Sequence, residues 1–122
     1  MIVSGLARDD KRLEIAKAFG ADHVVDVECN DLTECIWNAT EGRGVDLSID
    51  TAGGADTLST AMRLTRKNGA VLFAAAPETM PTNFQIGTLL AGRITLRPAG
   101  DTAMKPSSSR CDTSLQAVFR CT

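Results

Sequence analysis

The sequence has 122 residues, a length that allows one domain and no more. Its hydrophobic fraction of 43% is ordinary for a globular protein, and its net charge of −2 predicts no basic surface for nucleic acid. No apolar run approaches the roughly 18 residues that cross a bilayer, and no secretory signal opens the chain. We therefore expect a cytoplasmic protein that binds neither nucleic acid nor membrane.

The cysteines and the histidine predict no metal site. Cys29, Cys35, Cys111 and Cys121 match no paired C-x-x-C ligand pattern, so we interpret them as reduced structural thiols. The single histidine, His23, has no cysteine or carboxylate at metal-ligand spacing, and we interpret it as a surface or packing residue.

Short strands alternate with helices in the first half of the chain. β-branched runs predict three strands, over 1–5, 23–27 and 45–50. A helix is predicted over 10–19, because Asp9 or Asp10 can cap its first turn and Gly20 can end it. The residues expected on its buried side are Leu13, Ile15, Ala16 and Phe19.

Two further helices follow the same pattern. Asp31 can cap a second helix, with Glu34 three residues later as in a capping box. The expected buried residues of that helix are Leu32, Cys35, Ile36 and Ala39. A third helix is predicted over about 55–65, with an inward face of Leu58, Ala61, Met62 and Leu64.

The alternation of strands and helices continues to about residue 100 and is weaker beyond it. The apolar run 70–75 predicts a strand covered on both faces, and 93–97 predicts a last strand. Between them we expect a loop over 77–81 and a short helix stopped by Gly92. Beyond residue 100 we predict a loop and a truncated C-terminal helix whose apolar stripe is Leu115, Val118 and Phe119.

This alternation predicts the α/β class, with right-handed β-α-β units and a doubly wound parallel sheet. The order of the segments resembles the cofactor domain of the medium-chain dehydrogenase/reductase family, the zinc-type alcohol dehydrogenase group. The resemblance covers residues 1 to about 100. The segments that carry it are Val3-Ser4-Gly5, Arg12 to Lys17, Gly20 to Val25, Gly42 to Asp46, Ile49 to Gly53, Arg66 to Gly69 and Arg93 to Leu96.

The resemblance implies an incomplete Rossmann-like sheet. Its first strand and the glycine-rich loop that grips the pyrophosphate are expected before Met1 and are missing here. In the strand order 3-2-1-4-5-6 the missing strand is the central one. We therefore expect either a gap between the strands at 1–5 and 45–50 or direct pairing of the two. We also expect a destabilised, aggregation-prone chain with severely reduced cofactor affinity.

The resemblance places the adenosine ribose at Gly5, the end of the first strand. A carboxylate at this position would select NAD, whereas Gly5 with Arg8 and Arg12 leans weakly towards NADP, because two guanidinium groups could pair with a 2′-phosphate. The alternative interpretation is that Gly5 serves a turn and both arginines face solvent.

Two more segments are implied to touch the cofactor. Thr51-Ala52-Gly53 would lie against the adenosine, and a simple turn between strand and helix is the alternative. Ala74-Ala75-Ala76 would line the nicotinamide, although the family usually has glycine at Ala75 and commonly at Pro98. The carboxylates Asp46 and Asp50, which bracket one strand, are interpreted as structural.

The function implied is that of a fragment of an NAD(P)-dependent, zinc-dependent alcohol or polyol dehydrogenase, inactive alone. In the full-length protein, hydride would pass between an alcohol substrate and the nicotinamide. The zinc would belong to a catalytic domain absent here, so this chain has no catalytic or metal residue. The resemblance is compatible with a homo-oligomer. The alternatives are a zinc-free quinone-reductase-like fragment and a non-catalytic α/β binding module.

Overall fold

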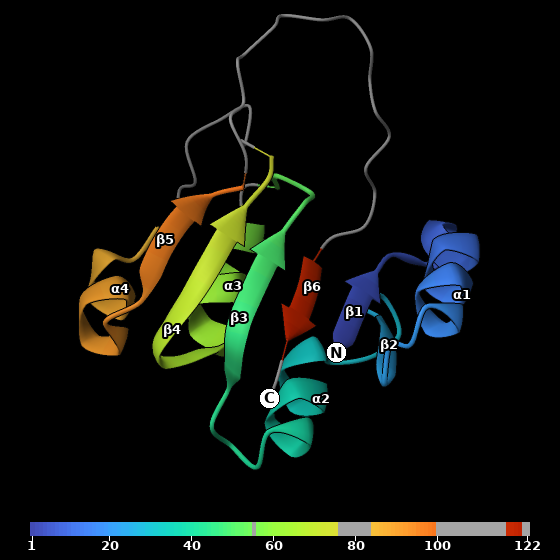
Figure 1. The fold of residues 1–122 in the computed structure, drawn as a ribbon, viewed down its shortest axis with the longest axis horizontal. Helices are drawn as coiled ribbons and strands as arrows, with labels where there is room; N and C mark the ends of the chain where they lie inside the picture. The colour runs from blue at the N-terminus through green and yellow to red at the C-terminus, as the bar shows by residue number, and fades with distance from the viewer. Residues whose placement is uncertain (55, 76–83, 100–116, 121–122) are drawn as a thin grey trace, which may run out of the picture.

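The computed structural model describes residues 1–54, 56–75, 84–99 and 117–120, and its elements form one six-stranded sheet flanked by helices (Figure 1). The elements are β1 (Ile2–Gly5), a 3₁₀ turn (Ala7–Asp9), α1 (Asp10–Ala18), β2 (His23–Asp26), α2 (Leu32–Ala39), β3 (Val45–Asp50), α3 (Thr57–Leu64), β4 (Thr65–Phe73), α4 (Ile86–Gly92), β5 (Thr95–Pro98) and β6 (Ala117–Arg120). The α/β class is confirmed. None of the described helices is long and apolar enough to cross a bilayer.

The strand order is β2-β1-β6-β3-β4-β5. β1 pairs with β2, β3 with β4 and β4 with β5, all in parallel. β6 is inserted between β1 and β3 and runs antiparallel to both (Figure 1). The two expected outcomes for the sheet centre, a gap or direct pairing of β1 with β3, are therefore both wrong.

The predicted C-terminal helix is also wrong over the residues that the structure describes, because 117–120 form β6. The central backbone groups of β1 and β3 require hydrogen-bond partners, and a strand supplies them where a helix cannot. The sequence Ala117-Val118-Phe119 contains β-branched and aromatic residues that suit a strand. The backbone groups of β1 and β3 that need partners thus favour a strand at 117–120, where the local sequence alone fits either a helix or a strand.

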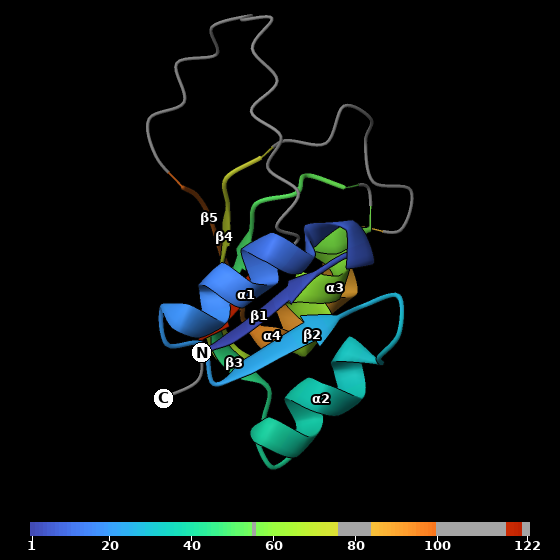
Figure 2. The same cartoon turned by 90° about the vertical axis from the view of Figure 1, so that its right-hand side faces the viewer.

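The helices cover the sheet on both faces. Alternate residues of a strand point to opposite faces, and Ile2 packs with Ile36 of α2 and Leu64 of α3, whereas Val3 packs with Leu13 of α1. α1 and α2 accordingly lie on opposite sides of β1 and β2 (Figure 2). A third cluster joins α3 and α4 to β4 and β5 through Ala61, Met62, Val71 and Ile94.

The predicted helices are confirmed with small shifts at their ends, but part of the predicted core is exposed. The predicted cap of the first helix is wrong for Asp9, whose side chain accepts from the N–H of Leu6 and makes no cap bond to α1. Asp31 accepts hydrogen bonds from the N–H groups of Thr33 and Glu34, and Gly20 has a φ of 97°. On α1, Leu13 is buried, but Ile15 and Phe19 are 54% and 84% exposed. The reason is that α1 packs mainly on β1 and β2 with one side, which leaves these two residues on its outer side.

Ala39 of α2 is exposed as well, against expectation, while Ile36 of the same helix is fully buried.

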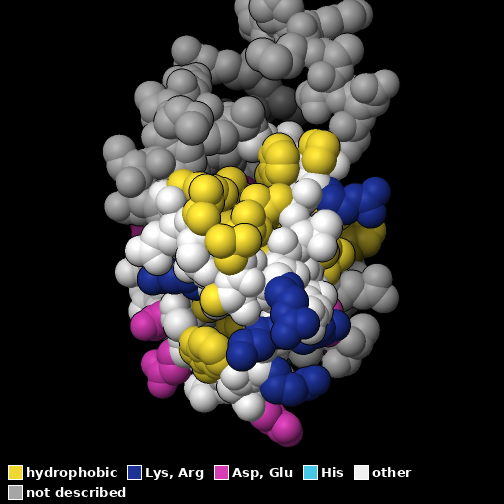
Figure 3. Space-filling view, turned by 90° about the vertical axis from the view of Figure 1, so that its left-hand side faces the viewer, with side chains coloured by type: hydrophobic (Ala, Val, Ile, Leu, Met, Phe, Trp, Pro, Cys, Tyr) yellow, Lys and Arg dark blue, Asp and Glu magenta, His cyan; other side chains and the backbone are white. Residues whose placement is uncertain are grey.

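Figure 3 shows a group of apolar side chains over α4 and β5, above a group of basic ones. In α4, Ile86 and Leu90 are 60% and 70% exposed. This face of the molecule is therefore only partly covered by the described residues.

β4 begins earlier than the predicted strand at 70–75. Its pairing with β3 jumps from Val45–Thr65 to Leu47–Ala70, so four residues bulge opposite Asp46. Gly69 lies in this bulge, where a Cβ would come within 2.5 Å of the Thr65 side chain and 3.0 Å of the Asp46 carbonyl oxygen. Asp46 forms an ion pair with Arg66 across the bulge, which agrees with a structural role.

Candidate functional site

The carboxyl ends of β1, β3, β4 and β5 lie along one edge of the sheet. Ser4 is in register with Ala117, Asp50 with Ala117 and Phe73, and Phe73 with Pro98. Each of the three predicted cofactor segments directly follows one of these strands. In open parallel sheets ligands bind at this edge, so the topology brings the loop after β1, the turn after β3 and the end of β4 to one side of the molecule.

The loop after β1 is built around a buried carboxylate that was not predicted to belong to the site. Asp9 is 3% exposed, and its Oδ2 accepts a hydrogen bond from the N–H of Leu6 at 3.1 Å. Its Oδ1 lies 3.6 Å from a guanidinium nitrogen of Arg12. Asp9 therefore closes the loop and holds Arg12 at its rim.

Gly5 is buried where β1 meets this loop. A Cβ at Gly5 would come within 3.1 Å of Leu13 Cδ2 and 3.4 Å of Asp9 Cβ. Both distances are tight, so glycine at this position allows α1 to pack closely on β1. This is a packing role for Gly5, which is the last residue of β1 and not part of a turn.

Arg8 and Arg12 are in different situations. Arg8 lies on the 3₁₀ turn and is exposed, whereas Arg12 is half-buried and paired with Asp9. A second unpredicted carboxylate, Glu28, accepts a hydrogen bond from the N–H of Ala7 at 3.0 Å. Glu28 lies beside the loop after β1 because Gly5 pairs with Asp26, two residues before it. This position could be predicted only if β1 and β2 were already known to be neighbours.

The end of β2 adds further negative charge beside this loop. Asp26 accepts a hydrogen bond from the N–H of Glu28 at 2.9 Å. The Asp26 carboxylate also raises the pKa of the exposed Cys29 thiol, first by a side-chain hydrogen bond and then by its charge. Asp26 therefore makes the Cys29 thiol harder to deprotonate than a free thiol.

The turn after β3 is organised by Asp50, which is 1% exposed. Its Oδ1 accepts hydrogen bonds from the N–H groups of Ala52 at 3.0 Å and Gly53 at 3.3 Å. Its Oδ2 accepts a third from the Thr57 hydroxyl at 2.8 Å, at the start of α3. Asp50 is therefore structural, as predicted, and it fixes the segment 51–53.

Gly53 has a φ of 64°, in the left-handed region that favours glycine. Thr51, Ala52 and Gly53 are all half-buried, so one side of the turn remains accessible. The turn can therefore offer its backbone to a flat ligand.

The end of β4 lies beside that turn. The N–H of Ala74 donates a hydrogen bond to the carbonyl oxygen of Asp50 at 2.8 Å, which joins the two segments. Ala74 is exposed and Ala75 is half-buried. Ala76, the third residue predicted to line the nicotinamide, lies outside the described residues.

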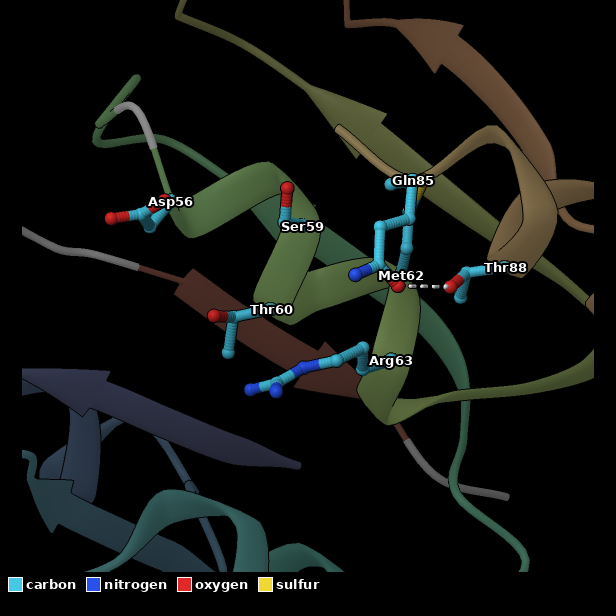
Figure 4. A pocket seen from close by; sticks show the side chains of 7 residues that line it. All are labelled: Asp56, Ser59, Thr60, Met62, Arg63, Gln85 and Thr88. Atoms are coloured by element: carbon cyan, nitrogen blue, oxygen red, sulfur yellow. Dashed lines mark hydrogen bonds between the residues drawn. The ribbon is translucent and has the colours of Figure 1, made fainter. Parts of the chain in front are cut away.

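Two cavities lie away from these segments. One of about 280 Å³ is lined by α3 and the start of α4 (Figure 4), through Asp56, Ser59, Thr60, Met62, Arg63, Gln85 and Thr88. Another of about 630 Å³ lies near the start of β2 and includes His23 and Cys35. None of the predicted cofactor residues lines either cavity.

No metal centre is formed by the part of the chain that the structure describes. It contains no group of three or more His, Cys, Asp or Glu side chains that could hold a metal ion. His23 is exposed, as a surface residue would be. Cys29 and Cys35 are free thiols, and Cys111 and Cys121 fall outside the described residues.

Known proteins resemble this chain in sequence and in fold. D-arabitol-phosphate dehydrogenase of Enterococcus avium is 36% identical over 69 residues, 57% of this chain and 20% of that protein. Sorbitol dehydrogenase of Bacillus subtilis is 36% identical over 67 residues, 55% of this chain and 19% of that protein. The chain thus spans about a fifth of the length of these curated relatives.

Solved structures of alcohol dehydrogenases share the fold of this chain. Zinc-dependent alcohol dehydrogenase 2 of Streptococcus pneumonia superposes with a TM-score of 0.70 and 29% identity, over 81% of this chain and 28% of that one. Benzyl alcohol dehydrogenase of Acinetobacter calcoaceticus gives a TM-score of 0.70 with 25% identity, over 80% and 26% of the two chains. The sequence model of zinc-binding dehydrogenases matches residues 1–116. The chain belongs to this family, the zinc-type branch of the medium-chain dehydrogenases/reductases.

Proposed function

We propose that this chain is part of the dinucleotide-binding domain of an NAD(P)-dependent alcohol or polyol dehydrogenase. The observation that carries the proposal is the common edge of the sheet, where the loop after β1, the turn after β3 and the end of β4 meet. The names of the relatives, which include sorbitol and D-arabitol-phosphate dehydrogenases, point to a polyol or related alcohol as the substrate.

The turn after β3 fits the adenosine end of the cofactor. Asp50 holds the backbone of 51–53 in a fixed shape before any ligand arrives, which lowers the ordering cost of binding. The left-handed Gly53 presents backbone without a Cβ at the accessible side of the turn. Ala74 and Ala75 would form a smooth wall for the nicotinamide ring, and the bound cofactor would supply the hydride acceptor.

The pyrophosphate has no matching cradle among the described residues. A glycine-rich loop at a helix N-terminus usually holds it. At the centre of this sheet, the chain instead enters the antiparallel β6 at Ala117, in the same row as Ser4 and Asp50. We therefore propose that the chain alone binds the dinucleotide weakly and through its adenosine half.

The loop after β1 bears on the choice between NAD and NADP. Asp9 is turned inward and bonded to Leu6 and Arg12, so it is not presented to a ribose. Arg8 is exposed and could approach a 2′-phosphate, which keeps the weak lean towards NADP. Glu28 acts in the opposite direction, because its carboxylate lies on the N–H of Ala7.

Catalysis would come from residues outside this chain. The described residues offer no ligand set for a catalytic zinc. We propose that the hydride-transfer step requires the remaining four fifths of a protein of the relatives' length, and that this chain alone is inactive.

The test is to map nucleotide contacts by NMR on the purified chain, with adenosine 2′,5′-bisphosphate and AMP as probes. We expect amide shifts in 51–53 and in Leu6 to Arg8, and larger shifts near Arg8 for the bisphosphate. A Gly53→Val variant, strained by its φ of 64°, should lose the response at 51–53. Gly20→Val is the matched control, because Gly20 is also left-handed and a Cβ there would meet nothing within 4 Å, and it should keep the response. Shifts confined to the cavity between α3 and α4 would contradict the proposal.

A further inference from the structure

The cavity between α3 and the start of α4 is polar on nearly all its sides. Six of its seven lining residues carry a charge, a hydroxyl or an amide, and the apolar one is the buried Met62. Its volume of about 280 Å³ lies at the lower end of the range for ligand pockets. Because no predicted cofactor residue lines it, the cavity is separate from the cofactor edge and suits a small polar ligand.

Arg63 gives the cavity a positive end. It lies in the last turn of α3 and forms none of the ion pairs found among the described residues. A guanidinium group carries five N–H donors and no acceptor, so its best partner is an anion. Figure 4 shows the side chains of Thr60 and Arg63 on the same side of α3, as expected for residues three positions apart in a helix. A carboxylate in the cavity can therefore be bound by the guanidinium and the Thr60 hydroxyl together.

Gln85 adds a donor from the other wall of the cavity. Its Oε1 accepts a hydrogen bond from the Thr88 hydroxyl at 3.4 Å, which orients the amide. The amide nitrogen is then directed towards α3 (Figure 4). An amide NH₂ group only donates hydrogen bonds, so this side chain also favours a ligand rich in acceptor oxygens.

Asp56 sets the opposite end of the cavity. It precedes α3 and stands seven residues before Arg63, or about 10 Å along the helix axis. A carboxylate repels a second anion but accepts hydrogen bonds from hydroxyl groups. Ser59 and Thr60 are half-buried between these two charged residues, and their hydroxyls can donate and accept. The lining thus favours a ligand with a negative group at one end and hydroxyl groups along the rest.

We propose that this cavity binds a small hydroxy acid, a carboxylate whose carbon chain carries several hydroxyl groups. Arg63 binds the carboxylate, with Gln85 as a second donor. Asp56 and Ser59 bind hydroxyls at the other end, and the carbon chain lies over Met62. The inference does not rest on the proposed function, because the cavity and the predicted cofactor segments share no residue.

The first test is an NMR titration of the purified chain at constant ionic strength, with D-gluconate as the probe. D-sorbitol has the same carbon chain without the charge, and acetate has the charge without the hydroxyls. We expect gluconate to shift the amides of Ser59, Thr60, Arg63 and Gln85, and to bind about fivefold more tightly than either reference compound.

Each reference compound can overturn one part of the proposal. Equal affinity for gluconate and sorbitol would remove the role of the Arg63 charge. Equal affinity for gluconate and acetate would remove the hydroxyl contacts and with them the ligand class. Gluconate shifts at 51–53 in place of the cavity residues would assign the acid to the cofactor edge and overturn the site.

The second test uses variants at exposed positions, where substitution leaves the fold intact. Arg63→Gln removes the charge, so it should weaken gluconate binding about fivefold and leave sorbitol binding unchanged. Arg97→Gln is the matched control: Arg97 is also exposed, but Leu96 beside it packs towards α3 and α4, so Arg97 points to the opposite face of the sheet. Gluconate binding that is unchanged in Arg63→Gln, or weakened equally in Arg97→Gln, would overturn the proposal.

Discussion

Two turns at the same edge of the sheet, one after β1 and one after β3, are each closed by a buried carboxylate, but the two are held differently. Asp50 accepts three hydrogen bonds, from Ala52, Gly53 and Thr57. Asp9 accepts a backbone bond from Leu6 and lies at ion-pair distance from Arg12. The turn after β3 is thus pinned to a helix, whereas the loop after β1 is closed by a backbone bond with a half-exposed cation beside it.

We expect the two turns to bind different parts of the cofactor. A pinned turn suits the part of a ligand that is the same in every cofactor, here the adenosine. A loop closed by an ion pair and edged by Glu28 can adjust to a ribose with or without a phosphate. Replacement of each carboxylate by alanine measures how much it stabilises its own turn.

The largest effect is expected at Asp50. Replacement by alanine leaves two N–H groups of a half-buried turn without their acceptor, and the Thr57 hydroxyl keeps only the carbonyl oxygen of Gly54. Asp50→Ala should therefore cost about 2–4 kcal/mol of unfolding free energy. Urea denaturation followed by circular dichroism measures it. Asp50→Asn keeps the shape and one acceptor oxygen, and should cost less than half as much. Equal losses for the two variants would show that charge, rather than geometry, holds the turn.

A smaller effect is expected at Asp9. Asp9→Ala removes the acceptor of the Leu6 N–H and the partner of Arg12 in an ion pair at 3.6 Å, so we expect a loss of about 1–2 kcal/mol. Because Arg12 is partly exposed, its share of that loss should be small. Arg12→Gln in the same denaturation assay isolates the ion pair. If Arg12→Gln costs as much as Asp9→Ala, the loop is held by the ion pair rather than by the backbone bond.

Glu28 should affect ligand choice more than stability. Its side chain is exposed, so Glu28→Gln should change the unfolding free energy by less than about 0.5 kcal/mol. Removal of its charge beside Ala7 should improve binding of adenosine 2′,5′-bisphosphate relative to AMP by about 2–5-fold, by analogy with exposed charge pairs. Competition titration of the two nucleotides gives this ratio. Glu34→Gln, on α2, is a control that should leave it unchanged.

The smallest effect concerns the reactivity of Cys29. Asp26 raises the pKa of this thiol by a hydrogen bond and by its charge, so Asp26→Asn should lower that pKa and increase the thiolate fraction at pH 8. Iodoacetamide labelling of Cys29, followed by peptide mass spectrometry, should become faster. Cys35, half-buried on α2, is the internal reference. An unchanged ratio of the two labelling rates would contradict the assigned cause.

Local signals in the sequence were sufficient wherever one residue type dictates a conformation. Gly20 and Asp31 marked helix ends correctly, because a left-handed stop and a carboxylate cap depend on neighbouring residues alone. The parallel sheet followed from the alternation of strands and helices. The role of Asp50 was also anticipated, although its three partners were not.

Features set by distant contacts were not predicted. Phe19 lies on the apolar pattern of α1, yet whether it is buried depends on what covers the far side of the helix. Ala117–Arg120 could be helix or strand by local pattern, and the unpaired edges of β1 and β3 decide it. Glu28 belongs to the candidate site only because β1 and β2 are neighbours. The ligand roles of Gly5, Arg8, Arg12, 51–53 and 74–76 stay predictions.

The bulge in β4 has a consequence for how the sequence can change in length. Four residues face Asp46, and Gly69 fits there without room for a Cβ. Deletion or insertion of one residue in this stretch would shift the following strand by one position. Val71, fully buried against α3, would then move to the opposite face, with Leu72 in its place after a deletion and Ala70 after an insertion. Length changes should therefore be tolerated far less in the bulge than in connections such as the one between β5 and β6.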